Sequence, residues 1–73
     1  MWGKTVKVGD PVMFVDTGRY AKWFYGQLGI VESHTKAQDG TYHVRVRWMR
    51  PVQYIDSQAT VSDFPESYFY SAR

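Results

Sequence analysis

Residues 26–50 read GQLGIVESHTKAQDGTYHVRVRWMR, and the second half of this stretch alternates between apolar and polar side chains. The apolar side holds every second residue from position 42: Tyr42, Val44, Val46 and Trp48. The opposite side holds the residues between them: His43, Arg45, Arg47 and Met49. A period of two residues is typical of a strand with one dry and one wet face. Asp39-Gly40, just before it, favours a hairpin, because glycine accepts the positive φ of a tight turn. We therefore predict a β-hairpin of strands 28–33 and 42–49, joined by a loop over 34–41.

The remaining segments predict three more short strands packed around this hairpin. Their β-branched and aromatic residues indicate strands at 12–15, 59–62 and 68–70. Residues 1–7 are expected to form a loose lead-in or a first edge strand. Pro51 is expected to end the pairing of the third strand, because proline has no N–H to donate. Residues 52–55 should continue extended and 56–58 should form a loop.

Two further features complete the expected architecture. Residues 63–67 predict a turn of 3-10 helix, because Asp63 can cap it and Pro65 is tolerated in a first turn. Gly29 indicates a bulge or a close backbone approach within its strand. Five short strands in one domain, residues 1–73, predict an all-β fold of the SH3-like small-barrel type.

Composition limits the class of protein. Aromatic residues make up 18% of the 73 residues, which supplies a dense core for a small domain. The chain has no cysteine, which excludes a disulfide scaffold and a cysteine-ligated metal site. No apolar run reaches membrane-spanning length, and the first residues lack the apolar segment of a signal peptide. We expect a protein that works inside a cell. The net charge of +2 is compatible with an acidic partner but is weak support for nucleic acid.

The residue types do not predict an active site. His34 and His43 are the only imidazoles, and both are expected to be ordinary surface histidines. The carboxylates are scattered, and no spacing matches a metal site or a phosphate-binding loop. We therefore expect no enzyme activity, no cofactor and no bound metal.

A binding surface is the remaining prediction. Arg45 and Arg47 should point to the same side of their strand, about 7 Å apart, with Arg50 just beyond. They would either pair with local carboxylates such as Glu32 or form a patch for an acidic partner, which the planar guanidinium suits. The segment 16–25 is expected to be a long loop. Its aromatic residues Trp23 and Phe24 would plug one end of the barrel, or the loop would present Lys22, Trp23 and Tyr25 to a partner.

Several short motifs together resemble the photosystem I reaction-centre subunit IV (PsaE) family. These motifs are residues 23–31, 42–48, 52–54 and 62–64, and the opening residues 9–12 are also similar to the start of that family. The wider group of small barrels in photosynthetic complexes has much the same pattern. The sequence departs from the family at Pro51, which is inserted, at His43, which replaces a proline, and at residues 64–70.

The resemblance implies a non-catalytic subunit on the cytoplasmic or stromal side of the thylakoid. Such a subunit associates peripherally with a membrane complex and helps to dock ferredoxin or flavodoxin, which are acidic. The family's docking arginine falls on Arg47, and its next basic position falls near Arg50. Electrostatic steering would be the mechanism, and salt would weaken it.

Other binding functions remain open at this point. Arginines beside exposed aromatic rings also suit a nucleic-acid-binding barrel of the KOW or Tudor type. A protein-interaction adaptor that uses Tyr20, Trp23 and Tyr25 is a third interpretation. Self-association that covers aromatic surface is compatible with the small size of the chain.

Overall fold

The computed structural model describes residues 6–72, and these form an all-β fold with little helix. The five strands are β1 (Pro11–Phe14), β2 (Leu28–Lys36), β3 (Tyr42–Tyr54), β4 (Ser57–Pro65) and β5 (Phe69–Ser71). Two short helices interrupt them, α1 (Ala21–Phe24) and the 3-10 helix η1 (Glu66–Tyr68). The predicted all-β class and the predicted number of strands are confirmed.

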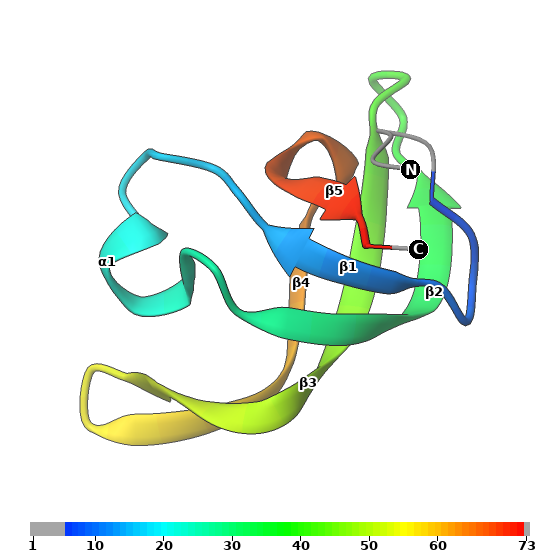
Figure 1. The fold of residues 1–73 in the computed structure, drawn as a ribbon. Coiled ribbons are helices and arrows are strands. Elements are labelled where there is room, and N and C mark those ends of the chain that lie inside the picture. Colours follow the sequence, from blue (N-terminus) through cyan, green and yellow to red (C-terminus); the bar gives the residue numbers. More distant parts are fainter. Residues whose placement is uncertain (1–5, 73) are drawn as a thin grey trace.

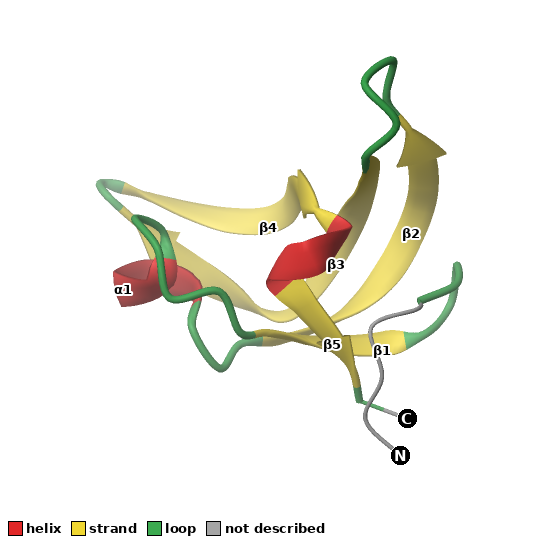
Figure 2. Cartoon of the chain, turned by 90° about the horizontal axis from the view of Figure 1, so that it is seen from above, coloured by secondary structure: helices red, strands yellow, loops and turns green. Residues whose placement is uncertain are grey.

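All five strands belong to one antiparallel sheet in the order β4-β3-β2-β1-β5 (Figure 1). The sheet bends around its own concave face, and η1 lies over that face between the ends of β4 and β5 (Figure 2). β4 and β5 are its two edges and do not pair with each other, so the sheet is open. Along the chain, the two edge strands are joined by η1 alone, which follows β4 and precedes β5 directly.

The central hairpin of β2 and β3 is longer than predicted but lies where the alternating pattern placed it. β2 runs on to Lys36, and the loop closes with a hydrogen bond from the Ala37 N–H to the Thr41 carbonyl. Gly40 has φ +90°, as the Asp39-Gly40 signal required. The ladder contains a bulge between Val31 and Ser33. Because of this extra residue, the inward and outward alternation of side chains along β2 reverses beyond the bulge.

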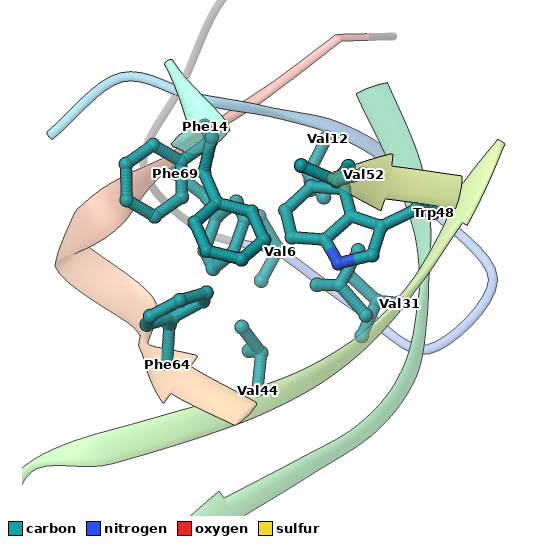
Figure 3. Packing of buried hydrophobic residues seen from close by; sticks show 11 residues of the cluster. Val6, Val12, Phe14, Val31, Val44, Trp48, Val52, Phe64 and Phe69 are labelled. Atoms are coloured by element: carbon teal, nitrogen blue, oxygen red, sulfur yellow. The ribbon is translucent and has the colours of Figure 1, made fainter. Parts of the chain in front are cut away.

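The core fills the concave face of the sheet with valines and aromatic rings. Among residues 6–72, eleven hydrophobic residues are buried: Val6, Val12, Phe14, Phe24, Val31, Val44, Val46, Trp48, Val52, Phe64 and Phe69. Phe14 contacts four other rings at centroid distances of 5.1–5.7 Å, including Phe64 and Phe69 (Figure 3). The indole N–H of Trp48 donates to Ser62 Oγ at 3.0 Å, so its burial leaves no polar group unpaired.

The predicted alternation of β3 is confirmed, and three of the four residues on its apolar side, Val44, Val46 and Trp48, are buried. Tyr42 lies on the same face but is 41% exposed. It lies beyond the end of the core, near the hairpin loop, where its ring stacks on His34 rather than on apolar residues. The close approach predicted at Gly29 is confirmed, because a Cβ there would overlap Val46 and the Arg47 carbonyl.

Pro51 lies where the regular pairing of β3 is interrupted, as predicted, but the pairing does not end there. β3 continues extended to Tyr54, as predicted for 52–55, and pairs with β4 again from Val52. The ladder between β3 and β4 shifts register between Arg47 and Val52, and Pro51 lies inside that shift, where its missing N–H breaks no regular pair. The predicted loop at 56–58 is shorter, since the turn passes through Ile55 at φ +57° and β4 starts at Ser57.

Other boundaries also differ from the predictions. The predicted long loop 16–25 contains α1, because Phe24 packs into the core and holds one helical turn against the sheet. The 3-10 turn is confirmed in kind but lies at Glu66–Tyr68 rather than 63–67, since β4 extends to Pro65. The expected N-terminal strand falls mostly on residues outside the described range, and Val6 and Lys7 are not in a strand.

Candidate functional site

Two of the predicted arginines lie on the convex outer face of β3. Arg45 and Arg47 alternate with the buried residues, so they project to the same side, as predicted. Arg45 Nε donates to Asp63 Oδ1 at 3.1 Å across the β3–β4 pair, and Arg47 Nε donates to Glu32 Oε2. The hydrogen bond that Arg45 donates to Asp63 raises the pKa of Arg45 above its ordinary value, so this guanidinium stays charged. Of the two predicted roles, pairing with local carboxylates is the one observed.

Arg50 differs from the other two arginines because no carboxylate of residues 6–72 forms an ion pair with it. It is exposed and lines a hollow of about 320 Å³ together with Gly26, Gln27, Leu28 and Met49. Of the three predicted arginines, Arg50 is therefore the one whose charge no described residue offsets directly.

The predicted aromatic and basic residues of the first loop separate into two groups. Trp23 packs edge-on against Tyr54, with centroids 4.9 Å apart and planes at 85°, and Lys22 Nζ lies 4.4 Å from the centroid of the Trp23 ring. These two residues pack beside the end of β3. Tyr25 is 55% exposed and lines a second hollow with Met13, Val15 and Tyr70. Trp23 is therefore mainly structural, whereas Tyr25 lies on the surface.

Sequence reasoning missed an outward apolar row that crosses the sheet. Tyr70 pairs with Met13 and Met13 pairs with Leu28, so three strands place these side chains side by side. Met49 of β3 joins Leu28 in lining the first hollow. Leu28, Met49 and Tyr70 are 42%, 56% and 38% exposed. The available signal was Met49, an apolar residue on the predicted wet side of its strand.

The two histidines have different environments. His43 is exposed on the outer face, as predicted. His34 was expected to be an ordinary surface histidine, but it lies half-buried on the inner face. Its Nε2 is hydrogen-bonded to Glu66 Oε2 at 2.8 Å, and its ring stacks on Tyr42 at 4.7 Å with planes 3° apart. This contact ties the hairpin to η1. Within residues 6–72, no three metal-ligating side chains come together.

The hairpin loop has one carboxylate with a perturbed acidity. The hydroxyl and the backbone N–H of Thr41 both donate to Asp39 Oδ1, at 2.7 and 3.0 Å. These hydrogen bonds lower the pKa of the Asp39 carboxyl, because they stabilise its charged form. These hydrogen bonds organise the hairpin loop.

Comparison with family models, with curated proteins and with solved structures finds no match. The resemblance to the PsaE family therefore stays a prediction. No helix in the described part of the chain is both long and apolar enough to cross a membrane.

Proposed function

We propose that this chain is a non-catalytic protein-binding module with the topology of an SH3-like small barrel. The strand order β4-β3-β2-β1-β5, the strong bend of the sheet and the 3-10 turn before β5 support this topology. Such a fold offers a rigid sheet face on which a partner can dock. A fold of this kind hosts many functions, so the surface has to supply the argument for binding.

The partner in this proposal is acidic. Arg45, Arg47 and Arg50 follow one another along one strand, and the first two share their charge with exposed carboxylates. The observation that carries the proposal is Arg50, which has no carboxylate partner within residues 6–72 and lies beside apolar side chains. An acidic group that reaches Arg50 gains both a charged hydrogen bond and neighbouring apolar contact.

An acidic electron carrier such as ferredoxin or flavodoxin is the specific partner that the PsaE resemblance suggests. The family's docking arginine corresponds to Arg47, which here is held by Glu32. We therefore expect Arg50 to contribute more than Arg47 to the electrostatic attraction of the acidic partner. Peripheral association with a photosynthetic membrane complex belongs to the same proposal and depends on the same resemblance.

Calorimetry with oxidised ferredoxin tests this proposal. The titration is run at about 0.01 M and about 0.15 M ionic strength, between which the Debye length falls from about 30 Å to about 8 Å. Wild type should bind, binding should weaken with salt, and Arg50→Gln should weaken it several-fold. The matched control is Lys36→Gln, which removes one positive charge from a residue that pairs with Tyr42 at the far end of β2. Equal effects of the two variants would contradict the role of Arg50.

A nucleic-acid-binding barrel is the second candidate, and one observation favours it. Tyr42 is exposed at the hairpin end, stacks on His34 and has Lys36 Nζ 5.9 Å from its ring centroid. Rings beside a cation can hold single-stranded bases. A gel-shift series with single-stranded DNA and RNA at low salt tests this candidate, and an absence of any shift would remove it.

A further inference from the structure

The outward apolar row adds an apolar contact surface to the charged one on which the proposed function depends. Tyr70, Met13 and Leu28 lie in cross-strand register on β5, β1 and β2, and Met49 on β3 continues the row. In β1, Val12 and Phe14 are buried, so Met13 between them projects to the outer face. Leu28 likewise precedes the buried Gly29 and projects outward. Four strands therefore contribute apolar side chains to one band of the convex face.

Two hollows are lined by residues of this band. One has a volume of about 450 Å³ and is lined by Met13, Val15, Tyr25 and Tyr70. The other has a volume of about 320 Å³ and is lined by Gly26, Gln27, Leu28, Met49 and Arg50. Met13 and Leu28, one from each hollow, are direct cross-strand partners. Exposed apolar side chains gathered in this way mark an interaction surface rather than scattered surface residues.

The charges around the band define the chemistry of what it binds. Arg50 lines one of the two hollows, and Arg47 lies three residues before it on β3, opposite Ile30. Neither hollow is lined by a carboxylate. Aromatic residues, methionine and arginine are the types enriched in the cores of protein–protein interfaces.

We propose that the two hollows bind an apolar segment of a partner protein that carries carboxylates beside its apolar side chains. This inference depends on the proposed function, because it names the kind of segment through which an acidic partner makes contact. One large apolar side chain enters each hollow, and a carboxylate reaches the Arg50 guanidinium. Methionine suits this role because its flexible side chain adapts to the shape of the ligand.

A second copy of the chain fits this surface less well. The protein carries a net charge of +2, and a symmetric dimer would bring the same patch of both molecules together. Arg50 of one copy would then face a band whose hollows contain no acidic group. Charge complementarity therefore favours a different, acidic chain as the occupant.

Two synthetic amphipathic peptides with identical leucines, one carrying glutamates and the other lysines, test the inference with the full chain by fluorescence anisotropy. The glutamate peptide should bind and the lysine peptide should not. Leu28→Ser and Met49→Ser should each weaken binding about tenfold, which is the effect of losing one buried apolar side chain. The matched control is Ile55→Asn, which removes a 64% exposed apolar residue at the β3–β4 turn and should leave binding unchanged.

Thermal unfolding of each variant shows that the fold is retained before binding is compared. Equal binding of the two peptides, no binding of the glutamate peptide, or equal effects of Leu28→Ser and Ile55→Asn would overturn the inference. A wild-type dimer in sedimentation that Leu28→Ser dissociates would overturn it too, in favour of a second copy. If ferredoxin binding is lost in Arg50→Gln but kept in Leu28→Ser, the proposed function stands and this inference fails.

Discussion

Gly29→Ala should destabilise the protein strongly, although it adds a single methyl group. Gly29 is a buried residue of β2 opposite Trp48. A Cβ at this position would overlap the Val46 side chain and would lie 2.7 Å from the Arg47 carbonyl oxygen. Val46 can move by rotation of its side chain, but the carbonyl belongs to the β2–β3 ladder and can move only with the strand.

The magnitude follows from the cost of overpacking a close-packed site, about 1–3 kcal/mol. We expect about 2 kcal/mol here, because one of the two overlapping groups is main chain. Domains of 73 residues have total stabilities of about 4–11 kcal/mol, so the loss is a large fraction. At about 4–8 °C per kcal/mol for this size, the melting temperature should fall by about 8–16 °C.

Differential scanning calorimetry of wild type, Gly29→Ala and Gly18→Ala measures this effect. Gly18 is the matched control, because a Cβ there would lie 2.8 Å from Asp16 Oδ2, which is the end of a half-buried side chain and not main chain. Its stability should change by no more than about 0.5 kcal/mol. If Gly29→Ala had the same melting temperature as Gly18→Ala, β2 and β3 would not approach each other closely at Gly29, and the prediction would be wrong.

Three further predictions concern stability. Phe14→Ala should lower the free energy of unfolding by about 3–5 kcal/mol, because this ring contacts four others. If the wild-type stability is at the low end of its range, thermal unfolding of the variant should no longer be cooperative. Ser62→Ala should lower the free energy of unfolding, measured with urea, by about 1–3 kcal/mol, since it leaves the buried indole N–H of Trp48 without its acceptor. Asp39 has a lowered folded-state pKa, so its stabilisation of the loop is present above the ordinary aspartate value of about 3.9 and is lost as pH falls through the lower folded value. The stability difference between wild type and Asp39→Ala should therefore shrink in acid, and a difference that grew would contradict the bond to Thr41.

The central hairpin could be predicted from sequence because its signals are local. Alternation along β3 and the Asp39-Gly40 turn together determine which face of the strand is buried. The return of pairing beyond Pro51 could not be predicted, because it depends on a register shift against β4 that the sequence of β3 alone does not encode. The helical turn α1 was missed for a similar reason, since only the docking of Phe24 into the core holds these four residues helical.

The bulge in β2 explains the error at His34. Strict alternation from Val31 would place His34 on the outer face with the arginines. The extra residue at Glu32 reverses the faces beyond it, so His34 lies opposite Val44 and reaches Glu66. The same bulge brings Glu32 within reach of Arg47. The placement of the arginines on one face was predictable from β3, whereas which of them would have a carboxylate partner depended on neighbouring strands.

The claim that the convex face of β5, β1, β2 and β3 is the binding surface is tested most directly by amide chemical shifts. The full chain, labelled with nitrogen-15, is titrated with the glutamate peptide and its backbone amides are followed. We predict that the largest shifts fall on Met13, Leu28, Met49 and Arg50, with little change on the opposite face. Shifts centred instead on His34, Tyr42 and Glu66 would place the binding site on the concave side and contradict the claim.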